Sequence, residues 1–119
     1  MLRITPFGAA GEVTGSNWLI DSGDPAERGS NRAQRSTKIL VDCGAFQGSH
    51  DAFERNQAPF PYDVGSIHAV ILTHAHLDHS GRLPNLIHAC YRGPIYATPA
   101  TRDLAAIELK DAVEIAIHP

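Results

Sequence analysis

Apolar and polar positions along the chain predict five strands and two helices. Runs rich in β-branched, leucine and aromatic residues predict strands at 2–7, 17–21, 37–42, 68–73 and 95–98. The strand at 68–73 contains the continuous apolar run A-V-I-L, which is typical of a strand buried on both faces of a sheet. Residues 44–56 are predicted as a loop with a single helical turn, and the proline-broken segment 58–63 as extended chain.

Two segments show apolar residues at helical spacing. The first predicted helix covers 79–91, with Pro84 tolerated because it falls in the first turn. Its apolar side comprises Leu83, Leu86, Ile87 and Cys90. The second predicted helix covers 99–117, where Thr98 is a suitable N-cap and Pro99 a suitable first residue.

The order of these elements predicts an α/β fold, with helices layered on one sheet. Early strands follow one another and pair as hairpins, the second hairpin closing through a long polar loop at 22–36, while later strands alternate with helices. We expect one domain over 1–119. The strands are too few to cover the apolar helix at 99–117, so we expect the sequence to be the front part of a larger domain.

Composition narrows the class of protein. A content of 43% hydrophobic and 19% charged residues is ordinary for a globular domain, and no apolar stretch is long enough for a membrane span. A net charge of −3 differs from the basic excess of a free-standing nucleic-acid binder. The N-terminus does not resemble a secretory signal, so we expect a cytoplasmic protein without a membrane partner. Cys43 and Cys90 are interpreted as small apolar residues in a reducing compartment.

The most informative stretch is H-A-H-L-D-H at 74–79, directly after the apolar strand. His74 and His76 leave the strand at positions i and i+2, so they point to one side, and Asp78 and His79 follow where the next helix opens. Imidazole and carboxylate suit zinc, and also iron or manganese. Packed imidazoles contribute nothing to stability by themselves. We therefore predict a metal site, with two ions that each take two of these ligands.

Asp42 ends the apolar strand in I-L-V-D-C-G, where a carboxylate needs a partner. A role in supporting a metal ligand fits: Asp42 would accept an N–H from a ligating histidine and so fix its tautomer. A strand-end aspartate that caps the following turn is the alternative. The remaining histidines are scattered and are expected to have surface or core roles: His50, His68, His88 and His118.

Two adjacent metal ions favour hydrolysis, and phosphodiesters benefit most because charge develops on their oxygens. Asp78 would then be both a ligand and a group that orients the attacking water. H-A-H-L-D-H resembles the signature of the metallo-β-lactamase fold superfamily, and I-L-V-D-C-G resembles the aspartate motif that precedes it. The stretches F-G-A-A-G-E-V-T-G-S (7–16), L-T-H-A-H-L-D-H-S-G-R-L-P (72–84) and G-P-I-Y-A-T-P-A-T (93–101) resemble the β-CASP group of RNA-processing nucleases.

The resemblance implies the front part of an αββα sandwich that holds two zinc ions. It assigns His74 and His76 to the first ion and Asp78 and His79 to the second, with Asp42 in support, and implies single-stranded RNA as substrate. In this family a further histidine, a bridging aspartate and a final histidine complete the site beyond position 119. We therefore expect the 119 residues alone to be inactive, as a fragment of an RNA-processing or RNA-decay enzyme.

Three other interpretations of the sequence are retained. The parent protein could be a metallo-hydrolase of another branch that acts on a thioester or lactone. It could be a non-catalytic homologue that serves as a scaffold, although such homologues usually lose ligands and all four are present here. A second copy could also complete the sheet and supply ligands, as a homo-oligomer.

Overall fold

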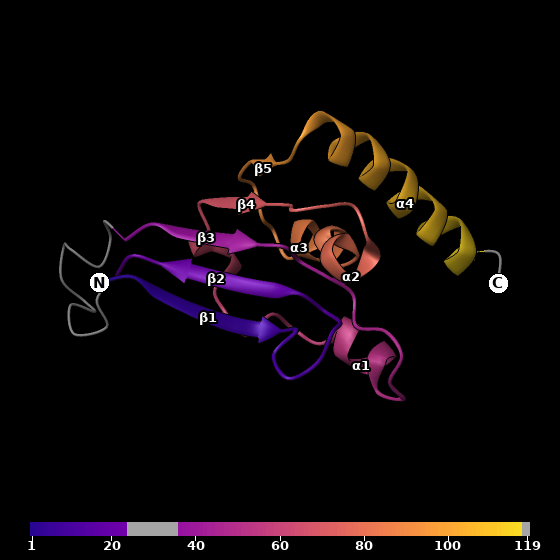
Figure 1. Cartoon of the computed structure of the whole chain (residues 1–119), viewed down its shortest axis with the longest axis horizontal. Coiled ribbons are helices and arrows are strands. Elements are labelled where there is room, and N and C mark those ends of the chain that lie inside the picture. Colours follow the sequence, from indigo (N-terminus) through magenta and orange to yellow (C-terminus); the bar gives the residue numbers. More distant parts are fainter. Residues whose placement is uncertain (24–35, 118–119) are drawn as a thin grey trace.

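A five-stranded mixed sheet forms the centre of the computed structural model, which describes residues 1–23 and 36–117 (Figure 1). The strands lie in sequence order: β1 (Arg3–Gly8), β2 (Asn17–Asp21), β3 (Lys38–Val41), β4 (Ala69–Ile71) and β5 (Ile95–Tyr96). The pairs β1/β2 and β2/β3 are antiparallel, whereas β3/β4 and β4/β5 are parallel. This arrangement confirms the predicted α/β class, with hairpins first and crossovers afterwards.

The second hairpin is closed where the sequence predicted it. Asp21 lies opposite Lys38, and the Ser22 N–H donates to the Thr37 carbonyl at 3.0 Å. Most of the predicted polar loop, residues 24–35, lies outside the described residues.

One face of the sheet packs against helices and connecting segments to form the core. Leu19, Leu40 and Val70 point to this face from β2, β3 and β4, and Leu40 and Val70 are fully buried. Leu83 and Leu86 from α3 (Leu83–His88) pack against them. Losing a side chain at such a fully buried position typically costs about 2–5 kcal/mol, so packing on this face contributes strongly to stability.

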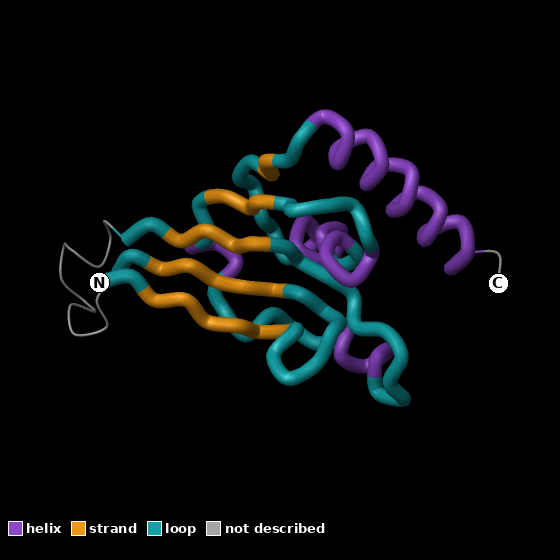
Figure 2. The backbone as a smooth tube through the Cα atoms, viewed as in Figure 1, coloured by secondary structure: helices purple, strands orange, loops and turns teal. Residues whose placement is uncertain are grey.

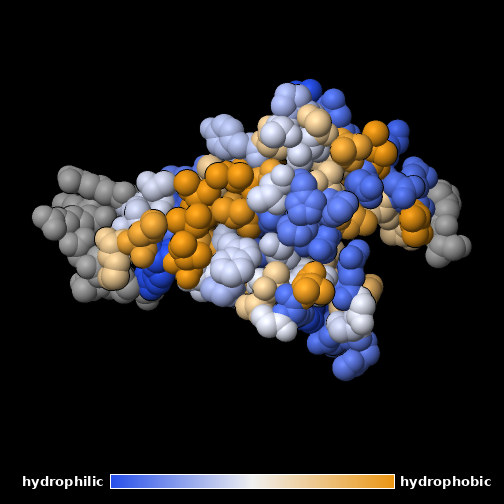
Figure 3. All heavy atoms as spheres, in the orientation of Figure 1, coloured by the Kyte–Doolittle hydropathy of each residue, from blue (hydrophilic) through white to orange (hydrophobic). Residues whose placement is uncertain are grey.

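The opposite face is also apolar but lies open among the described residues. Cross-strand neighbours on it are Ile4, Pro6, Trp18, Ile20, Ile39, Val41, Ile71 and Tyr96. Figure 3 shows hydrophobic atoms gathered over the strands. The expectation that 68–73 is buried on both faces is therefore wrong: Val70 is fully buried, whereas Ile71 is 41% exposed. The physical reason is that Leu83 and Leu86 of α3 pack on the Val70 face, whereas no described helix lies in front of the strands in Figure 2.

The predicted helix at 79–91 is two short helices, α2 (Leu77–Ser80) and α3. Gly81 lies between them, and a Cβ there would come within 2.6 Å of the Leu77 carbonyl oxygen and 2.7 Å of the Ala45 Cβ. Leu83 and Leu86 are buried as expected, but Ile87 is exposed. Tertiary packing around Gly81, together with Pro84 in the first turn of α3, divides the segment.

The described residues form three further helical elements: α1 (Ala52–Gln57), the 3₁₀ turn η3 (Val64–Ser66) and α4 (Pro99–Ile117). The helical turn predicted within 44–56 is α1, which lies at the C-terminal end of that segment. The α4 helix has the predicted bounds, and Thr98 Oγ1 accepts the Thr101 N–H at 3.2 Å as its cap. Within the described residues, no helix combines the length and apolar character required to span a bilayer.

Candidate metal centre

The candidate site lies where β3 and β4 end side by side. Asp42 follows β3 and adopts φ 62°, a left-handed conformation that aspartate tolerates better than most residues. Its N–H donates to the Ile71 carbonyl at 2.9 Å, which fixes it beside the end of β4. The Asp42 residue is only 3% exposed, so its carboxylate needs partners inside the protein.

The chain after β4 brings the hexapeptide side chains together. The ring centroids of His74 and His76 are 4.9 Å apart, and those of His74 and His79 are 4.0 Å apart. Asp78 and His79 lie in α2, which has only four residues, so they stand where the sequence predicted the opening of a helix. The structure therefore places these side chains at one edge of the sheet, with His76 exposed and the other three half-buried.

Asp42 holds His79 in one orientation. Its Oδ2 is 2.7 Å from His79 Nδ1, and because a carboxylate only accepts, Nδ1 must carry the proton. The other ring nitrogen, Nε2, is then an acceptor that is free to ligate a metal ion. The hydrogen bond predicted for Asp42 is thus present in the fold, in the form that metal-binding histidines usually have.

Sequence reasoning missed Thr73, which connects Asp42 to a second histidine. The Thr73 N–H donates to Asp42 Oδ1 at 2.8 Å, and its hydroxyl donates to Oδ2 at 2.8 Å. Since that hydrogen is committed, the hydroxyl oxygen accepts from His74 Nδ1 at 3.0 Å. The Nε2 atom of His74 is therefore also free. A threonine directly before the first histidine was visible in the sequence, but its contact with Asp42 depends on the β3/β4 pairing.

The neighbouring ligand atoms fit joint ligation of one ion. His79 Nε2 and Asp78 Oδ2 are 3.5 Å apart. Two ligand atoms of a tetrahedral zinc ion are separated by about 3.3–3.6 Å. Across residues 1–23 and 36–117, however, no three His, Cys, Asp or Glu side chains converge on a common point. This part of the chain thus brings fewer ligands together than the three protein ligands of a typical catalytic zinc site.

The other described histidines stand apart from this cluster, as expected. His68 Nδ1 accepts the Lys38 N–H at 3.0 Å, which is a structural contact between β3 and the start of β4. His50 and His88 are exposed, and His118 lies outside the described residues.

A mixed sheet that presents histidines and aspartates after its parallel strands is the architecture of a metal-dependent α/β protein. The chain belongs to the β-lactamase superfamily, because the model of the family described as "Beta-lactamase superfamily domain" matches residues 37–115. This membership confirms the superfamily that the motifs indicated, and it implies metal ions.

The relatives support the β-CASP branch of that superfamily, which the sequence motifs also indicated. The chain is 49% identical over 118 residues to "Ribonuclease TTHA0252" of Thermus thermophilus, covering 99% of this chain and 24% of that protein. It is 36% identical over 120 residues to "Transcription termination factor FttA" of Methanosarcina mazei and 38% over 116 residues to that of Methanocaldococcus jannaschii. Each of these two alignments covers 97% of this chain and 16% of the relative. The chain thus spans a quarter or less of the relatives' length.

Proposed function

We propose that the protein carrying this sequence is a metal-dependent RNA phosphodiester hydrolase of the β-CASP group. The observation that carries the proposal is the cluster of His74, His76, Asp78 and His79 after β4, with two of its rings oriented through Asp42. The similarity to a protein named ribonuclease over nearly the whole chain supports RNA as the substrate. The chain belongs to one catalytic domain of that protein.

The proposed cofactor is a pair of zinc ions, with His74 and His76 holding one and Asp78 and His79 the other. Bound zinc supplies Lewis-acid polarisation and a hydroxide nucleophile at neutral pH. The chain's own contribution is orientation. Asp42 keeps the proton on His79 Nδ1, Thr73 keeps it on His74 Nδ1, and both Nε2 atoms are directed away from these partners. The Asp78 carboxylate, beside His79 Nε2, would also accept a hydrogen bond from the attacking water.

The proposed location is the cytoplasm, and single-stranded RNA is the proposed form of the substrate. Both cysteines are free in the fold, with Cys43 buried and Cys90 exposed, which suits a reducing compartment. A phosphodiester of an extended single strand can reach a cluster that lies after the carboxyl end of β4, where His76 is exposed.

The test uses the protein from the complete reading frame, assayed in parallel on a labelled single-stranded RNA and an acyl-thioester. We expect RNA cleavage that a chelator abolishes and zinc restores. His74→Ala should lower this activity by more than the roughly 10–100-fold typical for loss of a residue that only supports a ligand. His88→Ala, an exposed histidine outside the cluster, is the matched control. Hydrolysis of the thioester but not of RNA would overturn the proposal.

A further inference from the structure

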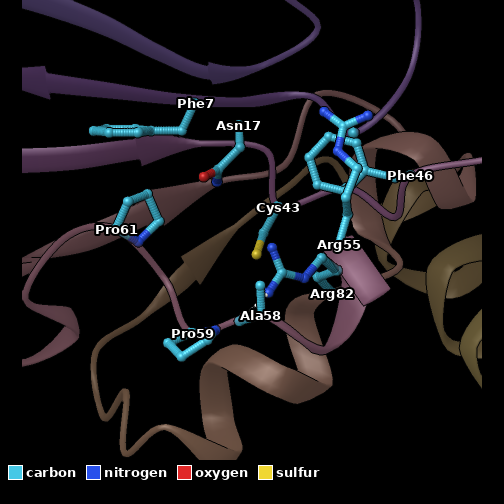
Figure 4. A pocket seen from close by; sticks show the side chains of 11 residues that line it. Phe7, Asn17, Cys43, Phe46, Arg55, Ala58, Pro59, Pro61 and Arg82 are labelled. Atoms are coloured by element: carbon cyan, nitrogen blue, oxygen red, sulfur yellow. Dashed lines mark hydrogen bonds between the residues drawn. The ribbon is translucent and has the colours of Figure 1, made fainter. Parts of the chain in front are cut away.

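Residues of the loop that follows Asp42, namely Cys43, Gly44 and Phe46, line one wall of a hollow (Figure 4). Its volume is about 240 Å³, and none of the proposed metal ligands lines it. Its apolar walls include Phe7, Phe46, Pro59 and Pro61, and Asn17, Cys43, Arg55 and Arg82 contribute polar or ionisable groups. Two arginines in a largely apolar hollow raise the question of what balances their charge.

Arg55 is balanced within the protein. Its two terminal nitrogens donate to the Glu12 carboxylate at 2.9 and 2.7 Å, and its guanidinium lies over the Phe46 ring at 3.7 Å. The hydrogen bonds from Arg55 hold the pKa of Glu12 below its usual value, so this pair is ionised at neutral pH. Arg55 therefore adds no unbalanced charge.

Arg82 is the opposite case. It is 7% exposed, and its guanidinium lies 4.3 Å from the Phe60 ring centroid while Nη2 donates to the Ala58 carbonyl at 2.7 Å. Its Nε is buried without a hydrogen-bond partner, the one such side-chain atom within the described part of the chain. No ion pair within that part of the chain includes Arg82. A buried N–H and a buried charge without an acceptor are both costly.

The groups next to Arg82 do not supply a negative charge at neutral pH. Burial raises the pKa of the Cys43 thiol to about 12 and raises the pKa of the Tyr62 hydroxyl well above its usual value. Both are therefore protonated, while the guanidinium stays charged. The Asn17 amide is already engaged, because its Nδ2 donates to the Asp42 carbonyl and its Oδ1 accepts from Tyr62. Arg82 thus brings an unbalanced positive charge to the wall of the hollow, and its buried Nε–H has no acceptor.

We propose that this hollow binds a small oxyanion, of which inorganic phosphate is the representative, on the guanidinium of Arg82. Oxyanions supply the negative charge and the acceptor atoms that the Arg82 guanidinium lacks, and charge-assisted hydrogen bonds to arginine are among the strongest in proteins. A water molecule occupies about 30 Å³ in the liquid, so 240 Å³ accommodates a phosphate with several waters. The apolar walls strengthen the attraction by lowering the local dielectric. The site needs no metal and stands independently of the proposed nuclease activity.

The experiment follows the arginine Nε–H signals by ¹⁵N nuclear magnetic resonance on the protein from the complete reading frame, with metal removed by chelation. Potassium phosphate is titrated against potassium chloride at equal ionic strength. We expect one Nε–H signal to shift with phosphate until it saturates, and to remain unmoved by chloride. Absence of a phosphate shift, or an equal shift with chloride, would overturn the proposal, and neither result depends on a variant.

A variant pair assigns that signal. Arg82→Lys keeps the charge but removes the Nε–H fork, and should abolish both the shifted signal and the rise in melting temperature that phosphate produces. Arg102→Lys, at a largely exposed position on α4, should leave both unchanged. A phosphate shift that persists in Arg82→Lys would place the anion elsewhere and contradict the assignment.

Discussion

At the scale of single residues, Asp42 is the centre of the candidate site. One buried carboxylate accepts from the Thr73 backbone, the Thr73 hydroxyl and His79 Nδ1, so it orients two histidines that the proposal assigns to different ions. Such partners of ligands tune metal affinity without touching the metal. Thr73 is therefore expected to influence zinc binding through His74.

Thr73→Val tests this role, because valine has nearly the same shape without the hydroxyl. We expect zinc affinity to fall by about 10–100-fold, since His74 loses the group that fixes its Nδ1 proton. The measurement is competition with a fluorescent zinc chelator. Thr73→Ser keeps the hydroxyl and should bind like the wild type. Equal affinities for the valine and serine variants would show that the hydroxyl has no positioning role.

The two cysteines should differ sharply in reactivity. Cys43 is 1% exposed, and burial raises its thiol pKa to about 12, whereas Cys90 is exposed. Because the thiolate is the nucleophile, Cys43 should stay protonated and inert from pH 7 to 9, whereas the exposed Cys90 is accessible to alkylation. Mass spectrometry after iodoacetamide treatment should find one modified cysteine of the pair in the native protein and both in urea. Alkylation of native Cys43 at pH 8 would contradict the burial described for it.

At the scale of elements, local signals predicted some boundaries and tertiary packing decided others. The start of α4 was predictable because Thr98 and Pro99 specify it locally: Thr98 Oγ1 accepts the Thr101 N–H, and Pro99 is the first helical residue. The break between α2 and α3 was not, because it depends on Gly81 packing against Ala45, which is distant in sequence. The histidine cluster was predictable because its members lie within six consecutive residues. Thr73 and Arg82, in contrast, acquire their roles only through contacts between segments that are distant in sequence.

The loop after Asp42 packs directly on α2, and glycine makes this possible. A Cβ on Gly44 would collide with the Asp78 carbonyl oxygen, while the Cys43 and Ala45 N–H groups donate to the His79 and Leu77 carbonyls. Gly44→Ala should therefore separate the loop from α2, destabilise the fold by at least about 1–3 kcal/mol and weaken zinc binding. Urea unfolding measures the first effect and chelator competition the second.

Gly65 offers the matched control for this substitution. A Cβ there would meet only the Asp63 side chain at an ordinary 3.4 Å, so Gly65→Ala should leave both stability and zinc affinity near the wild-type values. Equal stability of the two variants would mean that the loop does not need its close approach to α2.

At the scale of the whole molecule, no three candidate ligands converge among the described residues, and catalysis by a zinc site requires a fuller coordination shell. The 119-residue chain mixed with zinc and labelled RNA should therefore show little cleavage, whereas the protein from the complete reading frame should be active. Robust zinc-dependent cleavage by the 119-residue chain would show that its own residues suffice.

The two faces of the sheet give the last prediction, because neighbouring residues of β4 report on them separately. Val70 is fully buried in the core and Ile71 is 41% exposed on the open face. In the 119-residue chain, Val70→Thr should cost about 1–3 kcal/mol by burying a hydroxyl without a partner, whereas Ile71→Thr should stay within about 0.5 kcal/mol of the wild type. Urea unfolding followed through Trp18 fluorescence measures both. Equal costs would mean that both faces are covered in solution, and repeating the pair in the complete protein would show how far other segments bury the open face.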